Sequence, residues 1–91
     1  MSAQILKYEL TDAWEQQVEL YEGAQILDLE YKQDKVYLWA AVEANKPKCS
    51  FTIRTVETGG SIDLIKHIHI KTLHLISPWG QPLVLHYFRA I

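Results

Sequence analysis

The chain has 91 residues, a formal net charge of −2 and one cysteine, with 48% hydrophobic and 22% charged residues. This length predicts one domain over residues 1–91, with room for a compact core but not for a deep enclosed active site. The weakly negative charge argues against electrostatic binding of nucleic acid, and the lone Cys49 excludes an internal disulfide. No apolar run approaches the roughly 20 residues of a membrane helix, and no signal-peptide pattern opens the chain. We therefore expect a soluble cytoplasmic protein without membrane contact.

Alternating apolar and polar residues along most of the chain predict short β-strands joined by polar turns. Residues 13–22 are ambiguous, because their apolar residues fit both helical and strand spacing. Residues 62–65 are a candidate for one short helical turn. The predicted strands are residues 5–10, 17–21, 25–31, 36–42 and 49–56, followed by two strands in the last quarter of the chain. This order predicts a mainly β fold: a small antiparallel sandwich or partly open barrel of six to seven short strands, with at most one short helix.

The apolar residues of two neighbouring strands predict part of the core. Leu27 and Leu29 alternate with acidic residues and are expected to face inward. Residues 36–42 read VYLWAAV and are apolar on both sides, which is typical of a central strand covered on both faces. Tyr37 and Trp39 are therefore expected in the core.

The last quarter of the chain, residues 66–91, predicts a β-hairpin and holds all four histidines. Its two apolar runs flank the break Ser77-Pro78-Trp79-Gly80. If this break is a four-residue connection, Ile76 pairs with Gln81 and Lys71 lies opposite His86. One face then carries His67, His69, Lys71, Leu73, Leu75, Val84, His86 and Phe88. The other, which is the expected core face, carries Ile68, Ile70, Thr72, His74, Ile76, Leu83, Leu85, Tyr87 and Arg89.

The histidine spacing raises the possibility of a metal site. His67 and His69 lie on one face, about 6.6 Å apart along an extended strand, and His86 is a possible third ligand. Lys71 beside them would repel a cation, and no carboxylate completes the set. No nucleophile elbow or phosphate loop is present either. We therefore assign no metal site, no cofactor and no catalytic residue.

A binding surface fits these residues better. Cations could contact an anion and aromatic rings could stack on a nucleotide base. Trp79 lies in a turn from which it cannot easily reach the core of its own sheet, which indicates either a contact with a partner or a packing contact in which the turn folds back. The candidate ligand- or partner-binding residues are Arg54, His67, His69, Lys71, Trp79, His86 and Arg89.

Six short segments of the chain form a recognisable series: Glu22-Gly23-Ala24-Gln25-Ile26-Leu27, Leu38-Trp39-Ala40-Ala41-Val42, Phe51-Thr52-Ile53, Thr58-Gly59-Gly60-Ser61-Ile62, His69-Ile70-Lys71-Thr72 and Leu83-Val84-Leu85-His86-Tyr87-Phe88. They resemble, in matching order, a family of short proteins of unknown function that is widespread in tailed bacteriophages and prophages. The resemblance covers most of residues 17–89 and departs from the family at Leu85, where Trp is usual, and in the longer loop of residues 77–82. It implies a strand over residues 17–21 and a phage origin, with an accessory role in the bacterial cytoplasm.

These observations predict a small non-enzymatic phage-type accessory protein that binds a host protein, most simply one of a defence system. We expect a homo-oligomer, because small β domains often protect their open strand edges by self-association. Two alternatives stay open. One is sequestration of a small anionic nucleotide signal, and the other is a metal-dependent hydrolase that uses His67, His69 and His86.

Overall fold

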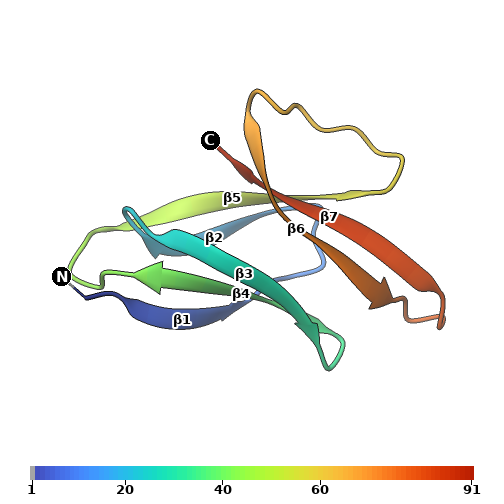
Figure 1. Cartoon of the computed structure of the whole chain (residues 1–91), viewed down its shortest axis with the longest axis horizontal. Coiled ribbons are helices and arrows are strands. Elements are labelled where there is room, and N and C mark those ends of the chain that lie inside the picture. Colours follow the sequence, from blue (N-terminus) through green and yellow to red (C-terminus); the bar gives the residue numbers. More distant parts are fainter. Residues whose placement is uncertain (1) are drawn as a thin grey trace.

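The computed structural model describes residues 2–91 and contains seven β-strands in two antiparallel sheets (Figure 1). Sheet A has the strand order β1 (Gln4–Glu9), β4 (Lys35–Val42) and β3 (Gln25–Lys32). Sheet B has the order β2 (Glu15–Tyr21), β5 (Lys48–Glu57), β7 (Pro82–Ala90) and β6 (His67–Ile76). The described residues form no helix and no closed barrel. The expected mainly β fold is thus confirmed as a small sandwich. Within the described range, no helix has the length and apolarity to cross a membrane.

Two local predictions in the first half of the chain are confirmed, and one in the second half is wrong. The ambiguous stretch is the strand β2, whose Val18 and Leu20 are buried. β3 and β4 form the expected hairpin, and its turn residues Gln33 and Asp34 have positive φ angles of 54° and 64°, as a tight two-residue turn requires. Residues 62–65 do not form a helix. A single turn closes at Asp63, whose carbonyl accepts the Lys66 N–H at 3.2 Å and whose carboxylate accepts the Ile65 N–H at 2.9 Å.

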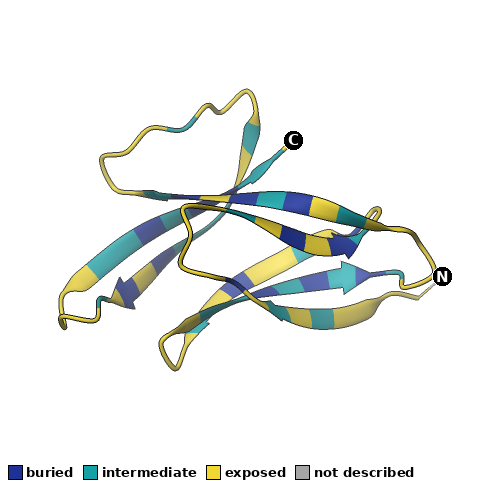
Figure 2. Cartoon of the chain, turned by 180° about the vertical axis from the view of Figure 1, so that it is seen from behind, coloured by how far each residue is buried: buried dark blue, intermediate teal, exposed yellow. Residues whose placement is uncertain are grey.

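The core lies between the two sheets and is formed by alternate residues of their strands. Buried and more exposed residues alternate along most of β4 and β5 (Figure 2). Each inward side chain therefore meets the opposite sheet, and the same strand keeps its polar residues outside. The largest fully buried side chains are Leu20, Leu29, Leu38, Val42 and Ile53.

The strands β3 and β6 each contain a bulge that changes which residues face the core. In β3 the register shifts between Ile26 and Asp28, so Ile26 packs on the core and Leu27 is 48% exposed. The expected inward position of Leu27 is therefore wrong, whereas Leu29 is buried as expected. In β6 the shift falls between His69 and Lys71. A bulge adds one residue to a strand, and the alternation of faces inverts beyond it.

The C-terminal hairpin differs from its predicted register. Ile76 pairs with Pro82 rather than Gln81, because Ser77 N–H donates to Gln81 O at 2.8 Å and lengthens the connection by one residue. His86 consequently lies opposite Thr72 and not Lys71. The expected core face is therefore wrong for the end of β6, where the buried residues are Leu73 and Leu75, while Leu85 and Tyr87 of β7 are buried as expected.

The outer face of sheet A is not covered by any other part of residues 2–91 (Figure 1). Tyr37 and Trp39 lie on this face and are half-buried, and neither belongs to the core. Their expected place in the core is wrong. The central strand β4 has neighbours on both edges but a covering sheet on only one face.

Candidate functional site

The candidate residues from the sequence do not converge on one site but lie in three regions. Arg54, His67, His69 and His86 lie on the outer face of sheet B. Lys71 and Arg89 lie on the side of sheet B that faces sheet A, near the strands β3 and β6. Trp79 lies alone at the tip of the β6–β7 hairpin.

On the outer face of sheet B, two histidines share one hydroxyl. Thr72 Oγ1 is 2.9 Å from His86 Nδ1 and 3.0 Å from His69 Nε2. The other nitrogen of His86 is 2.9 Å from Thr58 Oγ1, at the start of the β5–β6 connection. Both nitrogens of His86 are therefore engaged, since a neutral imidazole offers one donor and one acceptor. This chain of side chains ties the connection to the sheet.

The remaining histidine of the predicted set has its own partner. His67 Nδ1 is 2.9 Å from the Asp63 carbonyl oxygen, to which it can only donate. Across residues 2–91, no three His, Cys, Asp or Glu side chains come close enough to hold a metal ion. The three-ligand centre that the hydrolase alternative needs is thus not formed by His67, His69 and His86.

Two of the predicted cations are ion-paired on different faces of the molecule. Arg54 Nη1 lies 3.4 Å from Glu15 Oε1 on the exposed face of sheet B. Lys71 Nζ lies 2.9 Å from Asp28 Oδ1 of β3, so it joins the two sheets. The hydrogen bond from Lys71 lowers the pKa of the Asp28 carboxyl below its ordinary value of 3.8. These cations cannot act together on one anionic ligand.

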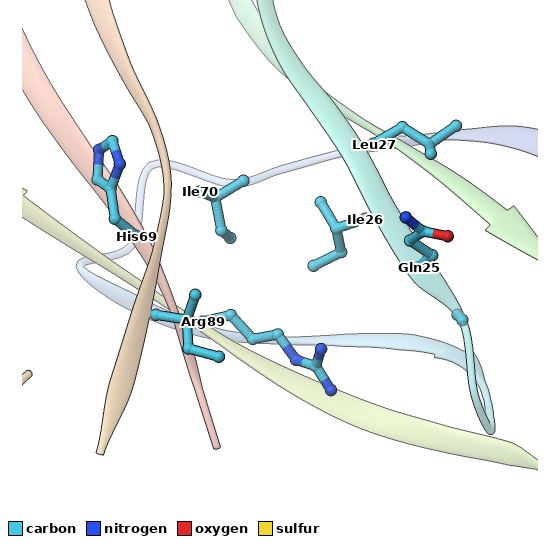
Figure 3. Close-up of a pocket in the computed structure, with 8 residues that line it drawn as sticks. Gln25, Ile26, Leu27, His69, Ile70 and Arg89 are labelled. Carbon is cyan, nitrogen blue, oxygen red and sulfur yellow. The ribbon is translucent and has the colours of Figure 1, made fainter. Parts of the chain in front are cut away.

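Arg89 lines a pocket of about 300 Å³ between β3 of one sheet and β6 and β7 of the other. In Figure 3, Ile26 and Ile70 face each other across this pocket, and the guanidinium of Arg89 extends into the space between the strands. The guanidinium carbon lies 4.3 Å from the centroid of the Phe51 ring. The other lining residues are Ala24, Gln25, Leu27, Ile68 and the backbone region of His69.

The Arg89 side chain has an unsatisfied donor. Its Nε atom is buried and has no hydrogen-bond partner. No ion pair among residues 2–91 includes Arg89. An unpaired buried donor costs about 1–3 kcal/mol, and such a group in a folded protein often marks the place of a missing ion or ligand.

Trp79 is 86% exposed, in a turn that Gly80 closes with a φ of 79°. Its ring is not part of the core, so the fold-back packing contact that the sequence left open is not formed. The contact of Trp79 with a partner stays a prediction.

Sequence reasoning missed the outer face of sheet A as a surface. The Lys7 ammonium lies 4.7 Å from the centroid of the Tyr37 ring and 5.6 Å from that of Trp39. Ile5, on the same strand as Lys7, is 56% exposed and pairs with Ala41. The available signal was the apolar character of both sides of residues 36–42. We attributed it to coverage on both faces, whereas two sheets can cover only one face of each other.

The fold and these surfaces define a small two-sheet β protein with several separate candidate contacts. Residues 1–91 match the family model described as Domain of unknown function (DUF7352), and the chain belongs to this family. No curated protein and no solved structure matches the chain.

Proposed function

We propose that this protein acts by binding another protein, and that the outer face of sheet A makes the contact. The observation that carries the proposal is the pair of Tyr37 and Trp39 on the central strand of that sheet, half-buried and outside the core. Tyr and Trp are the residues most enriched at the energetic centres of protein interfaces. A sheet also holds them rigidly, so little side-chain entropy is lost on binding.

One cation of this face, Lys7, indicates part of the chemistry of the partner, and the face also carries Glu9, Asp28 and Glu30, which lie opposite Tyr37 or Trp39. Lys7 lies over both rings, and no ion pair within residues 2–91 includes it. A partner carboxylate could therefore reach Lys7 without displacing an existing ion pair. We propose a partner surface with an apolar centre that packs on Trp39 and an acidic residue beside it that pairs with Lys7.

The origin and target follow from the phage resemblance and are part of the proposal. We infer a phage or prophage protein that works in the bacterial cytoplasm and binds a host protein of a defence system. The gene neighbourhood tests this origin. Repeated placement beside anti-defence genes of phages is the expected result, and consistent placement among bacterial housekeeping genes would contradict it.

The contact surface is tested with tryptophan variants. A candidate partner captured from host cells is purified, and its affinity is measured by calorimetry for the unmodified protein, Trp39→Ala, Trp79→Ala and Trp14→Ala. Loss of a central Trp contact costs about 2 kcal/mol or more, so Trp39→Ala should weaken binding roughly 30-fold. Trp79 and Trp14 are also exposed and serve as matched controls.

A second variant separates binding from folding. Lys7→Glu reverses a surface charge and should slow association with the same partner, with a smaller effect at high salt. Equal affinity of Trp39→Ala and the unmodified protein, or loss of binding only in Trp79→Ala, would contradict the proposed surface.

Self-association is a separate part of the proposal. Four edge strands could pair with another copy of the chain in the expected homo-oligomer: β1 and β3 of sheet A, and β2 and β6 of sheet B. Light scattering after size-exclusion chromatography should give a mass that is a multiple of 10.6 kDa. Trp79→Ala should lower that mass if the hairpin tip makes the contact. A mass of one chain at all concentrations would refute the oligomer.

A further inference from the structure

We infer that the Arg89 pocket is a binding site for a carboxylate carried on a short aliphatic body. This pocket lies between the sheets and does not include Lys7, Tyr37 or Trp39. The inference is therefore independent of the protein-binding surface proposed above. It rests on the geometry of Arg89, on the composition of the lining and on the size of the pocket.

Arg89 has donors available for an anion. Its guanidinium carbon lies 4.3 Å from the centroid of the Phe51 ring, and no ion pair among residues 2–91 includes Arg89. Nε is buried and out of reach of a ligand, whereas the two terminal nitrogens are not among the buried atoms without a partner. A carboxylate in the pocket would accept from both terminal nitrogens in the bidentate geometry that arginine favours.

No carboxylate of the described chain takes this place. Asp28, on the neighbouring strand β3, is held by Lys71 at 2.9 Å. Glu15 pairs with Arg54 on the opposite face of sheet B. The anion must therefore come from outside the part of the chain that the structure describes.

The lining selects a singly charged ligand with an apolar body. Apart from Arg89, Gln25 and His69, the residues around the pocket are aliphatic, namely Ala24, Ile26, Leu27, Ile68 and Ile70. A phosphate group would bring two charges and more acceptors than one guanidinium can satisfy, which makes its burial unfavourable. A monocarboxylate matches the single cation, and its aliphatic part matches the isoleucines.

The size of the pocket limits the ligand to a small group. A volume of about 300 Å³ corresponds to roughly ten waters at liquid density. It therefore accommodates an acid of about ten non-hydrogen atoms. The bulge residues Leu27 and Ile70 lie on its two sides, where β3 at the edge of sheet A and β6 at the edge of sheet B lie next to each other.

Two sources share this chemistry: a free aliphatic acid and the C-terminal residue of another protein chain. Hexanoate represents the first and N-acetylisoleucine the second, with hexanamide and N-acetylisoleucinamide as neutral matches. The readout is the chemical shift of isoleucine methyl groups during titration of the intact protein. Both acids should shift the methyl resonances of Ile26, Ile68 and Ile70. Each amide should bind at least about tenfold more weakly than its acid, because it cannot form the charged pair. The tighter acid identifies the source.

Ile68, which lies opposite Arg89 on the neighbouring strand, allows a test that keeps Arg89 in place. Ile68 is 51% exposed, pairs with Arg89 and lies on the same face. Ile68→Glu should place a carboxylate within reach of the guanidinium and abolish acid binding in a folded protein. Ile68→Gln makes the same change of shape without the charge, so it should weaken acid binding much less than Ile68→Glu does.

Two arginine variants complete the experiment. Arg89→Gln should abolish the response to both acids, whereas Arg54→Gln, on the opposite face of the same sheet, should leave it unchanged. Trp39→Ala should also leave it unchanged, which separates this site from the proposed protein contact. Absence of methyl shifts with either acid, equal binding of acids and amides, or full binding by Ile68→Glu would overturn the inference.

Discussion

Lys71 and Asp28 meet at 2.9 Å between the edge strands β6 and β3, and Lys71 directly follows a bulge in its own strand. Without the extra residue in β6, Lys71 would point to the outer face of sheet B beside the histidines, where the sequence predicted it. The bulge turns it toward sheet A instead. A single inserted residue thus removes the cation from the histidine surface and places it in a bridge between the sheets.

This bridge predicts a pH dependence of stability. The hydrogen bond from Lys71 lowers the pKa of Asp28 in the folded protein relative to the unfolded chain. The bridge therefore stabilises the fold above the unfolded pKa, and its contribution is lost as the pH falls through the folded pKa. Asp28→Asn should reduce stability at pH 7 by less than about 1 kcal/mol, because both side chains are about half exposed.

Urea unfolding at a series of pH values checks this prediction. The difference between the unmodified protein and Asp28→Asn should shrink between about pH 5 and pH 2. Lys71→Met should remove most of the difference at every pH, since it removes the partner. A difference that is constant with pH would contradict the role of the bridge.

At the scale of elements, the connection between β5 and β6 is held close to sheet B by small residues and polar contacts. Gly60 N–H donates to Glu57 O at 2.9 Å and closes a turn at the end of β5. A Cβ atom at Gly60 would lie 2.5 Å from Val56 Cγ1 and 3.1 Å from Glu57 O. Valine is stiff at χ1, so its methyl group cannot easily move aside.

Gly60→Ala should therefore destabilise the protein by about 1–3 kcal/mol through overpacking. The exposed neighbour Ser61 is the matched control, and Ser61→Ala should change stability by less than about 0.5 kcal/mol. The double variant Gly60→Ala with Val56→Ala should recover part of the lost stability, as measured by chemical denaturation. If the two substitutions are strictly additive, the contact does not cause the effect.

At the scale of the whole molecule, two sheets enclose one core and leave two faces outside. The outer face of sheet B is partly covered by the β5–β6 connection, whose Ile62 lies with Phe88 around a small hollow of about 160 Å³. The outer face of sheet A has no such cover in residues 2–91. This difference is the reason that the proposed protein contact falls on sheet A.

The stability of the sandwich should depend on the layer between the sheets. Leu38 on the central strand of sheet A is fully buried, whereas Leu64 in the β5–β6 connection is exposed. Leu38→Ala should cost about 2–5 kcal/mol, and Leu64→Ala less than about 0.5 kcal/mol. Urea midpoints measure both, and similar losses for the two variants would contradict the described core.

The positions of the strands were accessible from the sequence because alternation and turn chemistry are local properties. The β3–β4 hairpin, the buried side of β2 and the exposed Trp79 followed from neighbouring residues alone. The candidate sites were not accessible in the same way. Arg89 was identified, but its pocket combines residues 24–27 with residues 68–70 and Arg89, which are more than 40 residues further along the chain.

The sequence by itself determined a mainly β sandwich of short strands and its exposed hairpin tip. Only the tertiary structure decided which side of each strand faces the core beyond a bulge, because one inserted residue inverts every later side chain and leaves no mark in the apolar pattern. Tertiary structure also decided that Tyr37 and Trp39 lie outside. An apolar strand shows how much apolar surface it has, but not how many layers are available to cover it.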